Sequence, residues 1–344
     1  MKPFMLRKKK KLVTVTRRNG LSARMNGTDD YRMVTIDSVL RRSLADRGGD
    51  FVLTLDPAFQ GLPDAAHGGS VLAAFDALAG LAAPRDVSGV YKRRVPLATP
   101  LRLVTGRANG ARTFVLSDGD SVLVDGRVAP SAHHAGAGWI PSSTTRATDP
   151  ATTASGAPRP ATPRSNRSPK RSAPAPAHAL PLSRTCFACG VDNPLGLRAR
   201  LEFDDAEVRG TWQPREAFRT AEGALATAAV TTLLDETAFW LGALASGESG
   251  MTTDLRVTLH ASVPFGAALT VRGARAAVRS NPDDGRYWDT AVVATSEDGR
   301  PVAAARITFV AVRGAARRLV GGLLAMNDPA LLRRVFPAYT RPDA

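Results

Sequence analysis

The stretch Ala66-His67-Gly68-Gly69-Ser70 opens an apolar segment that runs to residue 81. The apolar side chains of this segment recur every three or four residues, at Val71, Leu72, Phe75, Leu78 and Ala79. That spacing places them on one face of a helix. The two glycines leave the backbone at the helix start open to close approach. The sequence therefore predicts a central helix whose first turn has no side chains at the two glycines. Asp76 lies in this helix, nine residues after His67.

A second copy of this pattern lies in the other half of the chain. Segment 224–244 is again apolar at helical spacing, and Asp235 lies 159 residues after Asp76. Later Val-Pro and Asp-Gly pairs recur as well, with offsets that grow to 168 at Pro264 and 180 at Gly299. Because the order of landmarks is the same, the sequence predicts a duplication with loop insertions in the second copy.

Strand-like runs follow each predicted helix. They cover 101–105, 113–116 and 121–128 in the first half, and 255–259, 268–272, 288–295 and 301–312 in the second. One helix cannot cover both faces of such a sheet. We therefore predict an α+β fold of two units, each an antiparallel sheet wrapped around a central helix, paired side by side as a pseudo-dimer.

The positive charge of the chain lies outside these two units. The 344 residues include 46 Lys and Arg against 31 Asp and Glu, a net charge of +15. Residues 1–24 hold nine bases and no acid, and residues 131–184 hold seven bases and one acid. These two segments account for the whole excess, so the predicted folded units are close to neutral. A basic nucleic-acid-binding face would lie within the periodic segments, and the distribution argues against such a partner.

Composition divides the chain into five segments. Residues 131–184 are rich in Ala, Pro, Ser and Arg and have no periodicity, which is typical of a flexible linker. We expect a disordered basic extension at 1–35, a first unit at 36–130, the linker at 131–184, a second unit at 185–320 and a tail at 321–344. No apolar run approaches the roughly 18 residues of a membrane span, and none follows the basic run as a secretory signal requires. We therefore expect a cytoplasmic protein without a membrane span.

Cys186 and Cys189 are the two cysteines of the chain. They exclude a disulfide scaffold and fit a reducing compartment. A single CxxC pair supplies half of a tetrahedral zinc site, and no second paired spacing of ligands lies near it in sequence. The pair is followed by turn residues and not by a helix, which argues against a redox motif. We therefore expect no metal.

Several motifs together resemble hotdog-fold acyl-CoA thioesterases of the phenylacetyl-CoA thioesterase type. They are His67-Gly68-Gly69 with Asp76 in the first half, and Cys186-Phe187-Ala188-Cys189-Gly190, Asn193-Pro194-Leu195-Gly196-Leu197, Leu233-Leu234-Asp235-Glu236 and Thr252-Thr253-Asp254-Leu255 in the second. The resemblance covers residues 36–130 and 185–312. It implies a tandem of two hotdog units, thioester hydrolysis, and coenzyme A as part of the substrate with no separate cofactor.

The chemistry of such a reaction fits the residues at the first helix start. Thioester hydrolysis needs a polarised carbonyl, and a helix N-terminus offers unpaired N–H groups and partial positive charge. Gly68 and Gly69 suit this role. The resemblance implies that a carboxylate, acting as base or nucleophile, comes from the paired unit, which in a duplicated chain is the other half. We therefore expect one composite site that joins His67, Gly68 and Gly69 to Asp235.

The second copy lacks the glycines. Positions equivalent to His67, Gly68 and Gly69 are Ala226, Thr227 and Ala228, so a mirror site containing Asp76 is expected to be degenerate. The resemblance assigns to Thr252 a hydroxyl that orients water and to Gln60 a substrate-orienting amide. Glu236 is a second candidate for the base, but as the neighbour of Asp235 it should point about 100° away on the helix.

Several alternatives stay open at this stage. Arg94 and Arg256, with Lys92 and Arg93, are candidates to meet the phosphates of coenzyme A, although exposed basic strand residues are common. Phe239 and Trp240 fit the core or an acyl pocket. The rival functions are a non-catalytic acyl-CoA or acyl-chain binding protein and a hotdog hydratase or dehydratase. The sequence also leaves open whether two such chains form a homodimer.

Overall fold

The computed structural model describes residues 34–132 and 176–339. Residues 1–33 of the predicted N-terminal extension and most of the predicted linker lie outside these residues. The first half contains, in order, α1 Ile36–Arg42, β1 Leu44–Asp46, β2 Phe51–Leu53, the 3-10 turn η1 Pro57–Phe59, α2 Gly68–Ala79, β3 Arg85–Tyr91, β4 Leu101–Ala108, β5 Ala111–Asp118 and β6 Ser121–Pro130.

The second half repeats the order from the 3-10 turn and central helix through four long strands, with η3 and β12 inserted among the strands and further elements at both ends. It contains β7 His178–Ala179, β8 Glu202–Phe203, β9 Glu207–Trp212, η2 Glu216–Phe218, α3 Thr227–Ser246, β10 Gly250–Leu259, β11 Leu269–Ala274, η3 Arg275–Ala277, β12 Arg279–Ser280, β13 Tyr287–Thr295, β14 Pro301–Ala311, α4 Ala315–Gly321 and α5 Pro329–Val335. The starts of α2 and α3 are 159 residues apart, the offset already seen between Asp76 and Asp235.

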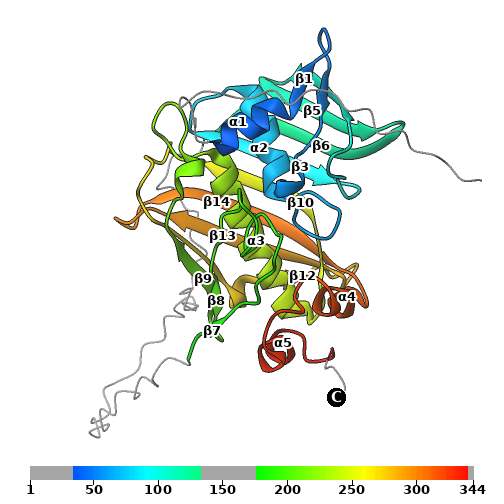
Figure 1. Ribbon diagram of the computed structural model, residues 1–344, viewed down its shortest axis with the longest axis vertical. Helices are drawn as coiled ribbons and strands as arrows, with labels where there is room; N and C mark the ends of the chain where they lie inside the picture. The colour runs from blue at the N-terminus through cyan, green and yellow to red at the C-terminus, as the bar shows by residue number, and fades with distance from the viewer. Residues whose placement is uncertain (1–33, 133–175, 340–344) are drawn as a thin grey trace, which may run out of the picture. The chain divides into compact units, whose positions relative to one another are not determined.

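All the strands belong to one antiparallel sheet of fourteen strands within the described residues (Figure 1). Its order is β1-β2-β4-β5-β6-β3-β10-β14-β13-β11-β9-β8-β7, with β12 paired to β13. The two halves meet at β3 and β10, where Arg85 pairs with Leu259 and Val90 with Asp254. Outward from this join the order β3-β6-β5-β4-β2 mirrors β10-β14-β13-β11-β9. The α+β fold and the duplication are therefore confirmed.

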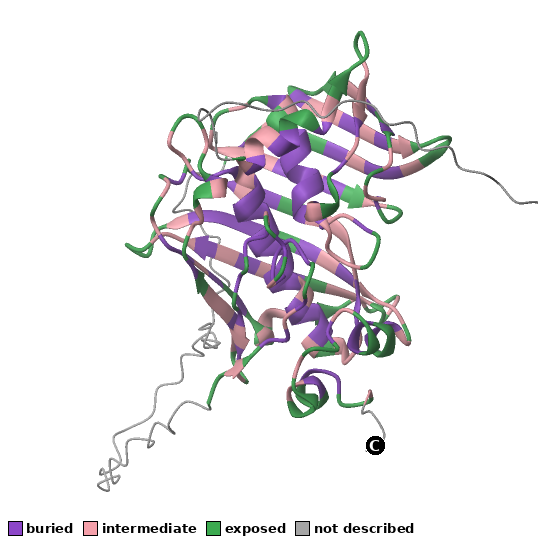
Figure 2. Ribbon diagram, viewed as in Figure 1, coloured by how far each residue is buried: buried purple, intermediate pink, exposed green. Residues whose placement is uncertain are grey.

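Helices α2 and α3 are the central helices of the two halves and pack against each other (Figure 1). Most of their residues are buried around the whole circumference, as the purple ribbons in Figure 2 show. Each helix ends at a glycine with positive φ, Gly80 at 61° and Gly247 at 68°. A left-handed residue of this kind terminates a helix at low cost. The predicted helices end within two residues of the observed ones.

Three expectations differ from the structure. Strands also precede the central helices in both halves. In addition, β3, the first-half strand at the join, was not predicted, because its sequence RDVSGVY mixes polar residues and glycine with few apolar ones. The end of the predicted linker packs onto the second unit through buried Leu180 and Ser183. The predicted tail contains α5, whose Val335 and the following Phe336 are buried against the core.

Candidate functional site

His67 and the two glycines form the first turn of α2. His67 has extended backbone (φ −66°, ψ 133°) and is the N-cap residue. The Tyr91 hydroxyl on β3 donates to the Gly68 carbonyl oxygen at 2.6 Å and fixes this turn. The N–H of Gly68 has no acceptor among the described residues, as expected for the first position of a helix. The turn therefore presents one free backbone donor.

Asp235 reaches this turn from α3, in the other half of the chain. Its Oδ2 accepts a hydrogen bond from the Gly69 N–H at 3.1 Å, and its Oδ1 accepts one from the Thr252 hydroxyl at 2.7 Å. The Asp235 side chain is buried. The structure thus brings together the five residues predicted as catalytic: His67, Gly68 and Gly69 at the start of α2, Asp235 on α3 and Thr252 on β10.

Glycine at both positions is needed for this arrangement. A Cβ on Gly69 would lie 2.6 Å from backbone atoms of Thr231 and Thr232, and a Cβ on Gly68 would lie 2.7 Å from Asp235 Oδ2. The Thr231 hydroxyl donates to the Gly69 carbonyl oxygen at 2.7 Å and holds the two helices at this close distance. The glycines therefore serve the contact between the helices as well as access to the backbone.

Glu236 does not point away from the site, contrary to the sequence expectation. Its Oε2 lies 3.4 Å from His67 Nε2, while His67 Nδ1 lies 3.1 Å from Asp235 Oδ2. The imidazole ring is long enough to bridge the two neighbouring acids, one at each nitrogen. Trp240 Nε1–H donates to Glu236 Oε1 at 3.0 Å and completes the burial of this carboxylate.

The two acids control the protonation of His67. Burial alone lowers the pKa of the imidazole, but the hydrogen bonds to Asp235 and Glu236 outweigh it and raise the pKa well above its ordinary value. The raised pKa favours the protonated ring, in which Nδ1–H donates to Asp235 Oδ2; in the neutral ring Nδ1 can accept from the Gly69 N–H, 3.3 Å away. The Gly69 N–H also donates to Asp235 Oδ2. Asp235 is therefore oriented by three donors, His67, Gly69 and Thr252.

The mirror position around Asp76 is closed by an ion pair. Arg85, the first residue of β3, donates to both carboxylate oxygens of Asp76 at 2.5 and 2.7 Å. The same guanidinium donates to the hydroxyl of Thr227 at 3.1 Å, at the start of α3 where the first half has glycine. Asp76 is buried. The Arg85 guanidinium thus lies between the Asp76 carboxylate and the start of α3, where a mirror site would be.

A cavity of about 110 Å³ opens beside Gly68 and Asp235. Its walls are mostly apolar and include three leucines on and after α4 that sequence reasoning missed. Lining residues are Leu62, Ala66, Tyr91, Val95, Phe239, Trp240, Met251, Leu319, Leu323 and Leu324. Trp240 is both a core residue and part of this wall. Arg93 and Arg94, which are exposed, line the cavity from its polar side.

Two predicted substrate residues do not reach the cavity. The Gln60 amide donates to the Thr185 hydroxyl at 2.9 Å and joins two loops. Arg256 pairs with Asp254 on its own strand at 2.8 Å. Lys92, one of the alternatives, pairs with Asp125. Of the basic residues proposed from the sequence, Arg93 and Arg94 are the ones that lie at the cavity.

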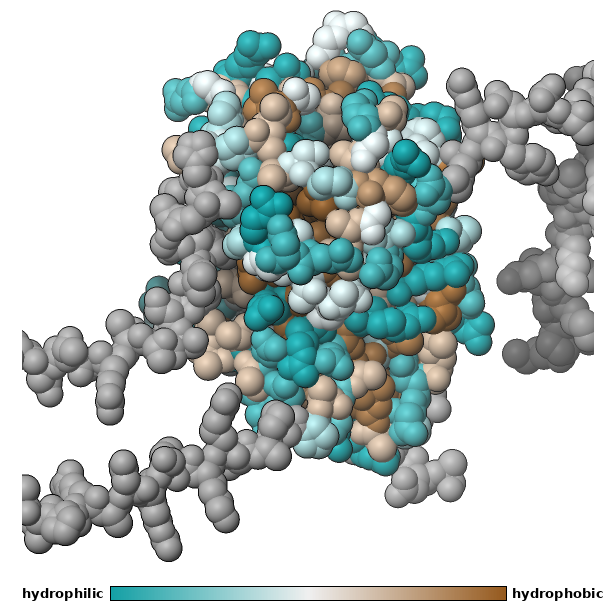
Figure 3. Space-filling view, turned by 90° about the vertical axis from the view of Figure 1, so that its left-hand side faces the viewer, coloured by the Kyte–Doolittle hydropathy of each residue, from teal (hydrophilic) through white to brown (hydrophobic). Residues whose placement is uncertain are grey.

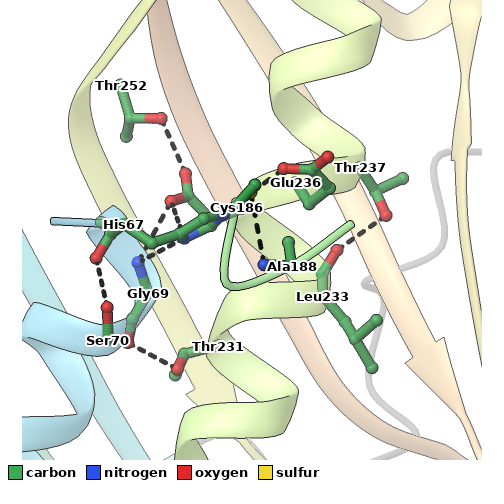
Figure 4. Close-up of polar contacts among 12 residues, drawn as sticks. His67, Gly69, Ser70, Cys186, Ala188, Thr231, Leu233, Glu236, Thr237 and Thr252 are labelled. Atoms are coloured by element: carbon green, nitrogen blue, oxygen red, sulfur yellow. Dashed lines mark hydrogen bonds and ion pairs between the residues drawn. The ribbon is translucent and has the colours of Figure 1, made fainter. Parts of the chain in front are cut away.

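Cys186 and Cys189 lie in the wall of the same cavity as free, buried thiols. A hydrogen bond between the two thiols lowers the pKa of Cys186 and raises that of Cys189 well above its ordinary value, with burial adding to the second shift. The Ala188 N–H donates to Cys186 Sγ at 3.3 Å (Figure 4). The sequence placed this pair in a turn but gave no sign that the turn adjoins His67.

The fold with this helix-to-helix site is a double hotdog: two hotdog units in one chain. Among solved structures, a candidate thioesterase II from Thermobifida fusca YX matches 80% of this chain and 99% of its own, with 16% identity and a TM-score of 0.50. A protein of unknown function with a hot dog fold from Alicyclobacillus acidocaldarius matches 80% and 97%, with 14% identity and a TM-score of 0.45. At such identities the first likeness establishes the fold and not the reaction. No family model and no curated protein matches the sequence.

Two surface features bear on partners. In the described residues no helix is long and apolar enough to cross a membrane. On the face shown in Figure 3, hydrophobic residues lie in small patches between hydrophilic ones. Scattered patches of this size are ordinary for a protein surface and indicate no docking face there.

Proposed function

We propose that the protein hydrolyses an acyl thioester at one composite site per chain. The observation that carries this proposal is the free Gly68 N–H at a helix start, beside a buried carboxylate of the other unit and an apolar cavity. The site combines a donor for a developing oxyanion, a general base and a pocket for an acyl group.

In the proposed reaction the thioester carbonyl oxygen accepts a hydrogen bond from Gly68 N–H. Asp235 takes a proton from a water molecule as the water oxygen attacks the carbonyl carbon, which gives a tetrahedral oxyanion. The oxyanion collapses and the C–S bond breaks. The proton on Asp235 passes to the departing thiolate, so the products are a carboxylic acid and a thiol. His67 and Thr252 keep the Asp235 carboxylate aimed at the water.

Coenzyme A is the proposed thiol carrier. Arg93 and Arg94 lie at the cavity next to its apolar walls and have no ion-pair partner among the described residues. Two adjacent guanidinium groups suit the phosphates of a long polar carrier, while the apolar walls suit the acyl group.

A panel of acyl-CoA esters tests this function. The wild-type chain is expected to release free thiol from at least one of them. Gly68→Ala keeps the backbone N–H but should lower kcat/KM by roughly 100-fold, within the usual contribution of a general base, because the new methyl group would lie 2.7 Å from Asp235 Oδ2 and displace that carboxylate.

Gly285→Ala is the matched control, since a Cβ there meets no atom within 4 Å, and its rate should equal that of the wild type. If the wild type binds acyl-CoA but hydrolyses none of the panel, the protein is a binding protein and the proposal is wrong. If it adds water to an enoyl-CoA, it is a hydratase and the proposal is equally wrong.

A further inference from the structure

Three potential metal ligands meet in the cavity wall, and the proposed hydrolysis does not use two of them. Cys186 Sγ, a ring nitrogen of His67 and a carboxylate oxygen of Glu236 all lie within 4.8 Å of one another, and all three residues are buried. They come from the turn that precedes β8, the start of α2 and the middle of α3. The fold therefore assembles a thiol, an imidazole and a carboxylate from three distant segments.

Their spacing is close to that of a tetrahedral metal site. Bonds of about 2.0–2.1 Å from zinc to nitrogen and oxygen place two such ligands roughly 3.3 Å apart. His67 Nε2 and Glu236 Oε2 are 3.4 Å apart. A thiolate lies slightly farther out, at a zinc–sulfur distance of about 2.3 Å, so the Cys186 side chain needs only a small movement to join them.

Each ligand is already held by a second hydrogen bond. His67 Nδ1 faces Asp235 Oδ2 at 3.1 Å, which leaves Nε2 directed toward Glu236 and Cys186. Glu236 Oε1 accepts from Trp240, and Cys186 Sγ accepts from the Ala188 N–H. A histidine that binds a metal through one nitrogen commonly donates from the other to a carboxylate, which fixes the ring. The groups around the ligands thus match the surroundings of a metal site.

Cys189 is the candidate for the fourth ligand. Its Sγ lies outside the 4.8 Å group, so its side chain must move to join the other three. It is buried, lines the same cavity and lies three residues after Cys186, a spacing common among zinc-binding cysteine pairs. The turn is tight, because a Cβ on Gly190 would lie 2.2 Å from the Cys186 carbonyl oxygen. Thiolate and imidazole ligands favour zinc over magnesium or calcium, which prefer oxygen.

We propose that Cys186, Cys189, His67 and Glu236 form a Zn²⁺-binding site in the wall of the cavity. The cavity gives the ion a path from solvent to these buried groups. The bound ion would connect the turn around Cys186 to both central helices. This inference concerns binding and does not depend on the proposed hydrolysis.

Co²⁺ is the spectroscopic probe for this site, applied to the tag-free full chain after chelator treatment and reduction. We expect one equivalent of Co²⁺ to bind per chain, with a thiolate-to-cobalt charge-transfer band and the visible bands of tetrahedral Co²⁺, and Zn²⁺ to abolish both. Because the chain has two cysteines, any thiolate band must come from this pair. Zn²⁺ should also raise Tm, since it binds the folded state.

Cys186→Ser should remove most of the charge-transfer band and the increase in Tm. Glu236→Gln, which keeps both thiols, should weaken Zn²⁺ binding by at least about tenfold in competition with a chromophoric chelator. His178→Asn, which changes a histidine outside the cavity, should bind like the wild type. If the reduced wild-type chain binds no stoichiometric Co²⁺, or binds it without a thiolate band, the proposal is wrong. The same holds if Glu236→Gln binds zinc as tightly as the wild type.

Discussion

Asp235→Asn is expected to lower kcat for thioester hydrolysis by about 10²–10⁴-fold, the usual contribution of a general base. Asparagine keeps the size of the side chain. Its carbonyl oxygen can accept from the Gly69 N–H while its NH2 group donates to the Thr252 hydroxyl, so the arrangement of α2 and α3 should survive. What is lost is the negative charge that takes the proton from water. Steady-state kinetics on the best acyl-CoA of the panel measures the effect, and KM should change little.

Glu236→Gln is the matched comparison for this prediction. Glu236 is the next residue on the same helix, is equally buried and also contacts His67. It has no contact with Gly69 or Thr252, so its loss should reduce kcat by less than about tenfold, a change that reflects a less well oriented His67. A larger loss in Glu236→Gln than in Asp235→Asn would identify Glu236 as the base and contradict the proposed assignment.

Asp76→Asn is expected to lower the free energy of unfolding by about 3 kcal/mol, near the lower end of the range for breaking a buried ion pair. The Arg85 guanidinium would keep its charge with no carboxylate beside it, and its side chain is only 13% exposed. Urea or thermal unfolding measures this change. The rate of hydrolysis per folded molecule should stay at the wild-type value, because Arg85 already separates Asp76 from the start of α3.

Asp50→Asn serves as the control for the ion pair. Asp50 pairs with Arg102 at 2.8 Å, but the two side chains are 38% and 67% exposed. Such a surface pair contributes at most about 1 kcal/mol. If Asp76→Asn unfolds like the wild type and loses hydrolysis, Asp76 is part of a reaction centre and the one-site model is wrong.

The parts of the site that could be predicted are those encoded locally. Helical spacing and the glycine pair located the start of α2, and the duplication then related Asp76 to Asp235 by position. The inference that Asp235 meets His67 rested on the family resemblance, which implies that the carboxylate comes from the paired unit. The observed bonds from Gly69 and Thr252 to Asp235 agree with that expectation.

The parts that could not be predicted depend on contacts between distant segments. Nothing near Arg85 in the sequence shows that it reaches Asp76, because its strand had to be placed in the sheet first. From helix geometry alone, Glu236 was predicted to point away from the site. In the structure the imidazole ring of His67 is long enough to contact both Asp235 and Glu236. The cysteine pair lacked candidate ligand partners in sequence, whereas the fold brings residues 67 and 236 within 4.8 Å of Cys186.

The two units that meet at β3 and β10 belong to one polypeptide, and this has a consequence for how the two helix starts can differ. In a dimer of identical subunits every substitution occurs twice, so an arginine that neutralises one carboxylate would neutralise both. In a fused chain each copy changes on its own. The two copies differ in this protein: Asp76 forms an ion pair with Arg85, whereas its counterpart Asp235 lines the cavity. Fusion thus lets one helix start carry a stabilising ion pair while the other stays open to the cavity, a difference that two identical subunits could not have.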